Sequence, residues 1–600
     1  MSTSLSEQAL AALQAGHADQ ACALFDQCIE QEDKPHILLQ AAFCYRSEGH
    51  LDKALSILRL LDERGQNSPP ALLLRADIFC SADRQHHALP LYRQLADMDD
   101  PKMSYPVALG LFNCGQIAAA QRLAEKLSRG EDASIAAYAK LLLGRCFAAS
   151  EQFEEAETIF ESVEGSEAIQ RSARFRQARL ALHQGHFDAA EKQFRELIEG
   201  RSDASGARES LLQTLIHSGQ TDAARAEIDA SATTCRDLPW LQHATDLLVE
   251  LGDPDALRLL EYAWSRDQSP ATFREYLSRL LVSRELSRAQ CLLDQYATSV
   301  GQDPHWRWGT SRYLSDSGEH EALLSFAGEG TLQRDMLESV CVSHFALGNY
   351  ARALELAQSL CREAPGDQHF IAMLVTALRC LDDPRYRSLI DPDNMVGVQS
   401  LDAEGEHLQG LSPDWTLISG ILAGRHSMTQ APQMQSVRDG LQTPGNLFSQ
   451  SQDPALTALK RLINERSQSF FDGAWMKQLP EAHPLHMFRP KRVSMHASWA
   501  IRGRMGTFHQ SHVHSKGWYS GTCYIEVPSS INDQSDAGHL VFGEPAFAVK
   551  DPVGPLAMVQ PKAGQLVLFP SYFWHSTRPY SGRGLRQVIA FDFGEANRFV

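Results

Sequence analysis

The sequence predicts a multidomain protein in which a long all-α superhelix of stacked helix pairs precedes a compact α+β domain with a β-sandwich or barrel core. Three observations support this prediction. A pattern of small, aromatic and glycine residues recurs about every 34 residues in the first part of the chain. The period is lost near residue 386, and short β-type runs with turn residues follow Trp499. A histidine-rich phrase lies among these β-type runs.

The repeat pattern is clearest near the N-terminus. The phrase that begins Ala42-x-x-Tyr45 and continues to Gly49 returns later as Ala76-x-x-Phe79. Weaker copies place the small residue of the second helix at Ala21, Ala120, Ala224, Ala256, Ala289, Ala322 and Ala353. About eleven helix pairs are therefore expected between residues 5 and 380.

Helix packing explains why these residue types recur. A small residue such as Gly144 lets two helices cross closely, and an aromatic residue such as Phe160 fills the space beside it. Glycines are expected to end the first helix of a pair at Gly49, Gly115, Gly185, Gly219, Gly252, Gly318 and Gly348. Because one pair cannot bury its apolar face alone, the pairs must stack into a superhelix with a continuous core and a concave groove.

Composition argues against several classes of function. The formal net charge is −18, whereas binding to nucleic acid or to an anionic membrane requires clustered Lys and Arg. We find no secretory signal and no run of about eighteen apolar residues, so neither a signal peptide nor a membrane span is expected. The 12 cysteines are scattered without a Cys-x-x-Cys pair, which favours a reducing compartment. We therefore expect a cytoplasmic protein.

The second part of the chain has a different organisation. We place the domain boundary between residues 385 and 386, and we expect a β-core at about 495–600. A helix is predicted from Ala455 to Ser469 because apolar residues recur there at helical spacing. Strands are predicted at residues 521–527, 539–542, 556–559, 565–568 and 587–593. Closely spaced strands of this kind form a sandwich or barrel, whose mouth is a common place for a small-molecule site.

Four histidines of this region form a candidate metal site. Side chains two positions apart on a strand face the same side, so His512 and His514 can point at one ion. We predict that these two residues and His575 are the ligands. His509 is expected to be an outer or substrate-side group, because it would face the other side of the strand. Imidazole and carboxylate ligands that leave coordination positions open suit a redox-active Fe(II), and two histidines with one carboxylate are the usual set.

The repeat pattern resembles tetratricopeptide repeats, since position, residue type and period agree over most of residues 5–380. This resemblance assigns residues 1–385 to an array of such repeats. It implies a scaffold that binds a protein or peptide partner in its groove. A spacer or an oligomerisation surface is the alternative, and the sequence does not single out groove residues.

Several phrases of residues 386–600 are similar to the double-stranded β-helix oxygenases that depend on 2-oxoglutarate and Fe(II), in the bacterial branch related to prolyl hydroxylases. The phrases are QTPGNLF (442–448), GTFHQSHVH (506–514), GWYSGTCY (517–524), VFGEP (541–545), LVLFPSYFWHST (566–577) and RQVIAFD (586–592). The resemblance implies a jelly-roll domain with Fe(II) and 2-oxoglutarate as cofactors. It also implies O2 as a further substrate.

The resemblance implies roles for individual residues. The His-x-Asp position of the family is occupied by His512 and His514, and the distal histidine by His575. Arg586, eleven residues after His575, matches the arginine that pairs with the far carboxylate of 2-oxoglutarate. Tyr524 is a candidate hydrogen-bond donor to the same cosubstrate. No catalytic side chain beyond the metal ligands is predicted.

The sequence departs from the family at one ligand position. His514 stands where the family has a carboxylate. Either the site is all-histidine, or a carboxylate from elsewhere, such as Glu544 or Asp592, completes it. The residues alone leave both possibilities open.

We expect a dioxygenase that hydroxylates a polypeptide recruited by the repeat array. No nucleic-acid or membrane partner is expected. Two alternatives remain: an oxygenase of a small molecule whose repeats serve assembly, and an inactive β domain within an interaction scaffold.

Overall fold

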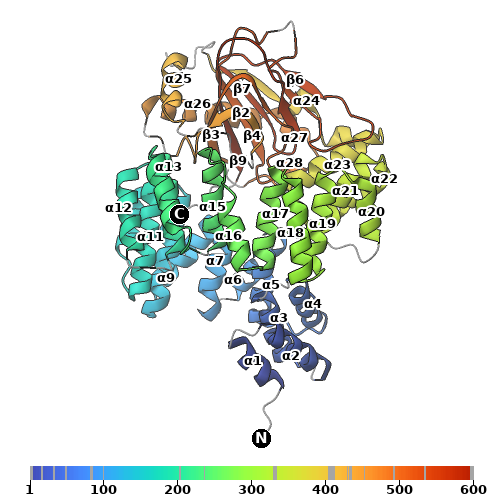
Figure 1. Ribbon diagram of the computed structural model, residues 1–600. Coiled ribbons are helices and arrows are strands. Elements are labelled where there is room, and N and C mark those ends of the chain that lie inside the picture. The colour runs from blue at the N-terminus through green and yellow to red at the C-terminus, as the bar shows by residue number, and fades with distance from the viewer. Residues whose placement is uncertain are drawn as a thin grey trace. The chain divides into compact units, whose positions relative to one another are not determined.

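The computed structural model describes residues 5–14, 18–31, 34–47, 51–81, 85–98, 101–199, 201, 204–235, 237–328, 334–402, 413–426, 428, 430, 435–449, 451, 453–490, 493–532 and 535–594. The chain divides after residue 177 into two compact units. The first unit is helical, and the second contains further helices and the described strands (Figure 1).

The first unit consists of consecutive antiparallel helices. They are α1 (Leu5–Gln14), α2 (Ala18–Gln31), α3 (Pro35–Ser47), α4 (Leu51–Glu63), α5 (Pro69–Ser81), α6 (Gln85–Asp97), α7 (Pro101–Asn113), α8 (Ile117–Ser128), α9 (Ala133–Ala149) and α10 (Phe153–Glu161). Helix α11 (Glu167–His183) spans the division between the units.

The helical array continues in the second unit. Its helices are α12 (Phe187–Ile198), α13 (Ser205–His217), α14 (Thr221–Ser231), α15 (Leu238–Glu250), α16 (Arg258–Arg266), α17 (Pro270–Val282), α18 (Leu286–Ser299), α19 (Pro304–Asp316), α20 (His320–Gly328), α21 (Leu337–Ala346), α22 (Tyr350–Glu363) and α23 (Gln368–Cys380), with the 3-10 turn η1 (Arg334–Met336) before α21. Helices α1 to α22 therefore form eleven consecutive pairs, which confirms the expected number.

Packing within the pairs follows the predicted chemistry, with two corrections. A Cβ atom on Gly144 would lie 2.5 Å from the buried Phe160 ring, so only glycine allows this approach. Gly348 follows α21 with a φ of +79°, the left-handed conformation that ends a helix. The prediction for Ala322 is wrong, because it is exposed and its neighbour Leu323 is buried. Ala256 precedes α16 instead of lying within it. Gly49 lies outside the described residues.

The first helices of successive pairs form a continuous layer in the second unit. Contacts join each first helix to the first helix of the next pair, from α13 through α15, α17 and α19 to α21. Among the described second helices, such contacts are fewer. Ion pairs join this layer, for example Arg279 of α17 to Asp246 of α15 at 3.0 Å. We call the surface formed by α13, α15, α17, α19 and α21 the inner layer.

Short elements lead from the repeats to the β domain. They are η2 (Pro384–Ser388), α24 (Pro392–Met395), β1 (Gly397–Ser400), α25 (Trp415–Ala423), β2 (Val437–Gln442), α26 (Pro454–Phe471), α27 (Ala474–Gln478) and α28 (Pro484–Met487). Helix α26 contains the predicted helix of residues 455–469 and extends it at both ends. Among the described helices, none is both long and apolar enough to cross a bilayer.

Two antiparallel sheets form the β domain. The strands are β3 (Ser494–His509), β4 (Tyr519–Glu526), β5 (Leu540–Phe542), β6 (Ala557–Val559), β7 (Gln565–Pro570), β8 (His575–Thr577) and β9 (Arg586–Gly594). The larger sheet has the order β1-β7-β4-β9-β3-β2, and the smaller has the order β6-β5-β8. This architecture confirms the predicted fold class, an all-α repeat array followed by a jelly-roll domain.

The five predicted strands are present as β4, β5, β6, β7 and β9, whereas β1, β2, β3 and β8 were not predicted. Strand β3 is sixteen residues long and pairs with both β9 and β2. Its sequence contains Gly503 between two arginines and a second glycine at Gly506, so it lacks the continuous apolar alternation that identifies a strand. Strand β8 has only three residues, too few to show a period.

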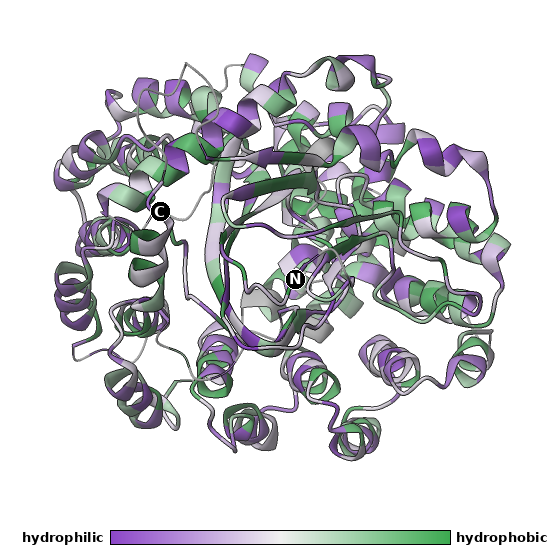
Figure 2. Cartoon of the chain, turned by 90° about the horizontal axis from the view of Figure 1, so that it is seen from above, coloured by the Kyte–Doolittle hydropathy of each residue, from purple (hydrophilic) through white to green (hydrophobic). Residues whose placement is uncertain are grey.

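One hydrophobic core spans the last repeats and the β domain. It includes Phe345 of α21 and Met373 of α23 as well as Phe569 and Phe591 of the large sheet. Figure 2 shows hydrophobic residues along the strands, whereas the helices alternate between hydrophobic and hydrophilic residues. The boundary at 385/386 stays a prediction: it follows the end of α23, and the core is continuous across it.

Candidate metal and cosubstrate site

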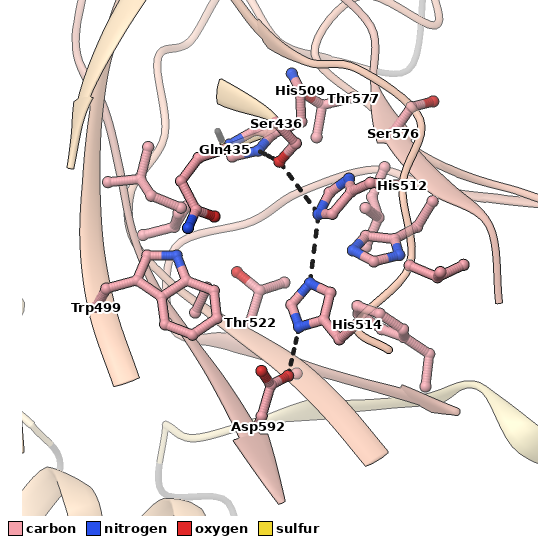
Figure 3. Close-up of a pocket in the computed structure, with 18 of the residues that line it drawn as sticks. Gln435, Ser436, Trp499, His509, His512, His514, Thr522, Ser576, Thr577 and Asp592 are labelled. Atoms are coloured by element: carbon pink, nitrogen blue, oxygen red, sulfur yellow. Dashed lines mark hydrogen bonds and ion pairs between the residues drawn. The ribbon is translucent and has the colours of Figure 1, made fainter. Parts of the chain in front are cut away.

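A cavity of about 580 Å³ lies in the β domain, lined by both sheets and by the segment between β3 and β4 (Figure 3). All four histidines singled out from the sequence line it, as do Arg586 and Tyr524. The fold therefore brings together residues that are up to 77 positions apart, from His509 to Arg586.

Backbone pairing positions two of the histidines. Strand β3 ends at His509, so His512 lies beyond it, and His575 is the first residue of β8. The two residues form an isolated bridge in which each backbone N–H donates to the carbonyl of the other, at 3.1 Å and 3.0 Å. The bridge, and not an unbroken strand, places both imidazoles on one side of the cavity.

Each of the three predicted ligands has an acceptor at its Nδ1 atom. The Gln510 carbonyl lies 2.9 Å from Nδ1 of His512, and the Phe573 carbonyl lies 2.9 Å from Nδ1 of His575. The third acceptor is a carboxylate oxygen, Oδ1 of Asp592, at 2.5 Å from Nδ1 of His514. Acceptors at Nδ1 hold the proton there and leave Nε2 as the metal-binding atom.

The remaining nitrogens fit a single metal ion. One ligand atom from each of His512, His514 and His575 lies within 4.8 Å of the others. The Nε2 atoms of His512 and His514 are 3.3 Å apart, and two nitrogens bound about 2.1 Å from one ion at about 90–110° are about 3.0–3.4 Å apart. Burial lowers the pKa of His512 to about 3, with a smaller contribution from His514. The neutral imidazole that a metal requires is therefore favoured.

The structure also locates the two carboxylates considered as alternative ligands. Asp592 faces the outer nitrogen of His514 and accepts a second hydrogen bond from the Ser520 hydroxyl at 2.7 Å. Burial alone would raise the pKa of Asp592, but His514, and to a smaller extent His496 and Ser520, hold it below its ordinary value. Glu544 accepts two hydrogen bonds from Arg578, both at 2.8 Å, and is not among the residues that line the cavity.

Two further groups touch the histidines. The Ser436 hydroxyl lies 3.1 Å from Nε2 of His512 and 3.0 Å from Nδ1 of His509. His509 is therefore connected to His512, one of the three predicted metal ligands, through the Ser436 hydroxyl. Trp499 of β3 stacks on His514 with a centroid distance of 5.7 Å. Neither Ser436 nor Trp499 was predicted, because a single serine or tryptophan carries no metal-site pattern in the sequence.

Arg586 has a buried guanidinium with no carboxylate partner among the described residues. The residue is 3% exposed. Its guanidinium donates to the Thr577 hydroxyl at 3.3 Å and to two carbonyl oxygens at 3.4 Å and 3.5 Å, and it lies 5.4 Å from the centroid of the Tyr580 ring. Burial lowers its pKa, and no acidic residue opposes this effect. An unpaired buried cation is costly, so this end of the cavity suits an anionic ligand.

Tyr524 is a protonated donor in the same cavity. Burial raises the pKa of its phenol to about 12, although Arg586 opposes the shift. The charged side chains of the lining, apart from histidines, are Arg438, Lys516, Arg586 and Asp592. Three cations therefore face one carboxylate, which favours entry of a small dianion.

The last helix of the repeat array contacts the residues beside the predicted ligands. The Gln368 backbone N–H at the start of α23 donates to the Ser515 carbonyl at 3.3 Å, and Ser515 follows His514. The Trp574 indole, one residue before His575, donates to the Thr376 hydroxyl of α23 at 3.0 Å. Helix α23 thus packs against both segments that carry the histidines.

Comparison with protein families agrees with this architecture. Residues 497–592 match the family model described as "Putative 2OG-Fe(II) oxygenase". Residues 12–78 and 175–239 match two models described as "Tetratricopeptide repeat". No curated protein matches the chain.

Solved structures resemble parts of the chain. A prolyl-4-hydroxylase from Pseudomonas putida is 15% identical, with 37% of this chain and 100% of that chain covered and a TM-score of 0.23. A tetratricopeptide repeat protein from Parabacteroides merdae is 16% identical, with 45% and 96% covered and a TM-score of 0.30. Because both TM-scores are below 0.5, neither likeness defines the arrangement of this chain. The family models thus match tetratricopeptide repeats in the N-terminal part of the chain and, in its C-terminal part, a domain described as "Putative 2OG-Fe(II) oxygenase".

Proposed function

We propose that the protein is a 2-oxoglutarate- and Fe(II)-dependent dioxygenase that hydroxylates a polypeptide held by its repeat array. The observation that carries this proposal is the buried, carboxylate-free guanidinium of Arg586 in the same cavity as three converging imidazoles. A metal-binding group and an anion-binding group in one enclosed space match a cosubstrate that is both a chelator and a dicarboxylate.

Different residues of the cavity would bind the metal and the cosubstrate. His512, His514 and His575 would hold Fe(II), which together with 2-oxoglutarate and O2 would supply the oxidising chemistry that converts a C–H bond to an alcohol. Arg586 would bind the far carboxylate through two parallel N–H donors. Tyr524 would donate a hydrogen bond to the same carboxylate.

The apolar part of the lining would surround the carbon chain of the cosubstrate. Leu540, Phe569 and Val588 line the cavity and are buried. Apolar walls exclude water and strengthen the ion pair to Arg586, because opposite charges attract more strongly at low dielectric.

Purified protein is expected to form succinate from 2-oxoglutarate when Fe(II) and O2 are supplied. Removing the metal with a chelator should stop succinate formation, and adding Fe(II) back should restore it, because an ion held by three imidazoles would be exchangeable. Succinate measured by mass spectrometry checks this expectation. The proposal fails if the protein neither consumes 2-oxoglutarate nor gains thermal stability from Fe(II) and 2-oxoglutarate together.

The polypeptide part of the proposal is supported by the inner layer. A groove of about 170 Å³ lies among α17, α19 and the start of α21. Apolar Val282 and Trp308 line it beside Arg312 and Glu338, which offers a peptide both apolar and charged contacts. Glu338 also lies 3.3 Å from His369 of α23, and His369 packs edge-on against Trp574. The inner layer and the ligand-bearing segments are thus in continuous contact.

Val282→Asp is expected to reduce hydroxylation of the polypeptide substrate about tenfold while leaving substrate-free succinate formation unchanged. Val282 is 40% exposed in the groove, and losing an apolar contact that becomes buried on binding costs about 1–2 kcal/mol. The substrate is identified by mass spectrometry as the polypeptide that gains one oxygen atom with wild type but not with Arg586→Ala.

Val300→Asp is the matched control, because Val300 is 42% exposed and follows α18, a second helix outside the inner layer. Equal hydroxylation by both variants and wild type would remove the reason for assigning recruitment to the inner layer. Succinate formation without any modified polypeptide would favour a small-molecule substrate.

A further inference from the structure

We propose that Asp592 is a positioning residue that supplies the carboxylate of this metal site from outside the coordination sphere, through His514. This inference rests on the proposed function, since it concerns how the chain holds the Fe(II) of that function. It explains how a site with histidine at a carboxylate position retains a negative charge beside the metal.

The three imidazoles differ in the acceptor that each Nδ1 atom meets. His512 and His575 donate to neutral backbone carbonyls, whereas His514 donates to the carboxylate of Asp592 at 2.5 Å. A charged acceptor makes a stronger hydrogen bond than a carbonyl and raises the basicity of the opposite nitrogen. The carboxylate of Asp592 therefore acts on His514 through a direct hydrogen bond, which neither of the other two imidazoles has.

A closed ring of hydrogen bonds fixes His514 at both its backbone N–H and its imidazole ring. The His514 backbone N–H donates to the Ser571 carbonyl at 3.0 Å, and the Ser571 and Ser520 hydroxyls are 2.8 Å apart. The Ser520 hydroxyl then donates to Oδ1 of Asp592, the atom that also accepts from His514. Because Ser520 and Asp592 are register partners on β4 and β9, the sheet itself places the carboxylate.

Packing around the network leaves His514 little freedom. Trp499 stacks on its ring at an interplanar angle of 29°. A Cβ atom on Gly517 would clash with the Ser571 hydroxyl, so glycine is needed there for Ser571 to approach. Apart from His514, no cation forms an ion pair with Asp592 among the described residues. His514 is therefore the imidazole to which this carboxylate is directly bonded, and His496 acts on the carboxylate only through its charge.

Asp592→Asn keeps the shape of the side chain and removes its charge. We expect it to weaken Fe(II) binding about 10–100-fold, the usual effect of removing a carboxylate that orients a metal-bound histidine. Affinity is measured anaerobically on the full chain by competition with a chromophoric chelator. The absorption spectrum of bound Co(II) provides a second readout, because it reports the ligand field at the metal and does not depend on turnover.

Three further variants separate positioning from a structural role. Ser520→Ala, which removes the second hydrogen bond to Asp592, should shift affinity in the same direction by a smaller factor. Glu544→Gln is the matched control, because Glu544 is paired with Arg578 outside the cavity and should leave affinity unchanged. In a His514→Asp background, which brings a carboxylate to the metal directly, Asp592→Asn should leave affinity unchanged or increase it.

The outcomes are distinguishable. An equal loss on Asp592→Asn in the wild-type and His514→Asp backgrounds would show that Asp592 supports the fold and not His514. An unchanged affinity and Co(II) spectrum in both Asp592→Asn and Ser520→Ala would overturn this inference while leaving the proposed function intact. A wild-type protein that binds no Fe(II) would overturn both.

Discussion

Replacing Arg586 by alanine is expected to raise the KM for 2-oxoglutarate about 10²–10³-fold, with succinate formation as the measurement. The guanidinium is 3% exposed and has no carboxylate partner among the described residues, so the cosubstrate would provide its counter-ion. Removing one partner of a buried, hydrogen-bonded charge pair costs about 2–5 kcal/mol, and each 1.4 kcal/mol is about a tenfold change in affinity.

Fe(II) affinity should stay close to wild type in the Arg586 variant, since Arg586 would contact the cosubstrate and not the metal. Arg586→Lys should recover only part of the loss, because an ammonium group cannot make two parallel hydrogen bonds to one carboxylate. Arg578→Ala is the control: Arg578 is paired with Glu544 and lies outside the cavity lining. A similar rise in KM for the Arg578 and Arg586 variants would place the cosubstrate elsewhere.

His575→Ala is expected to abolish stoichiometric Fe(II) binding and to reduce succinate formation to the background of free Fe(II). His575 is 6% exposed and contributes one of the three nitrogens that converge on a single position. Two imidazoles retain an iron ion much less well than three, and the ferrous ion is exchangeable. Anaerobic metal titration of the purified full chain measures the loss.

A folded variant is required for this result to be informative. Circular dichroism and thermal unfolding of His575→Ala are therefore compared with those of wild type, and His575→Gln provides a variant closer in size. His486→Ala is the control, because His486 bonds to the Met476 carbonyl in a different part of the domain. Full Fe(II) occupancy and turnover in both His575 variants would exclude this residue from the site.

Local patterns predicted the repeats and much of the β domain, because the residues that define each of these elements lie close together in the sequence. A helix pair needs a small residue and an aromatic residue only a few turns apart, as in Gly144 and Phe160. Strands β4, β7 and β9 are buried apolar runs that can be recognised alone. Strand β3 was not predicted, because charged residues interrupt its apolar pattern. Its sixteen residues are recognised as a strand only from their pairing with β9 and β2.

The candidate site also combines features that are close in sequence with contacts between distant segments. The spacing of His512, His514 and His575, with an arginine eleven residues later, is enough to predict a metal and anion site. The spacing could not reveal that Ser436 lies beside His512, since these residues are 76 positions apart. Packing of α23 against Trp574 and Ser515 joins segments even further apart in sequence.

The sequence by itself determined the two kinds of architecture, the residue types at the predicted metal site and the unusual histidine at position 514. Local residue chemistry and periodicity are sufficient for these conclusions. Only the tertiary structure decided where the carboxylate lies. Asp592 is 78 positions from His514, and the pairing of β4 with β9 brings it to the outer nitrogen of that imidazole. Strand register is a long-range property, so no local pattern could have placed Asp592 there.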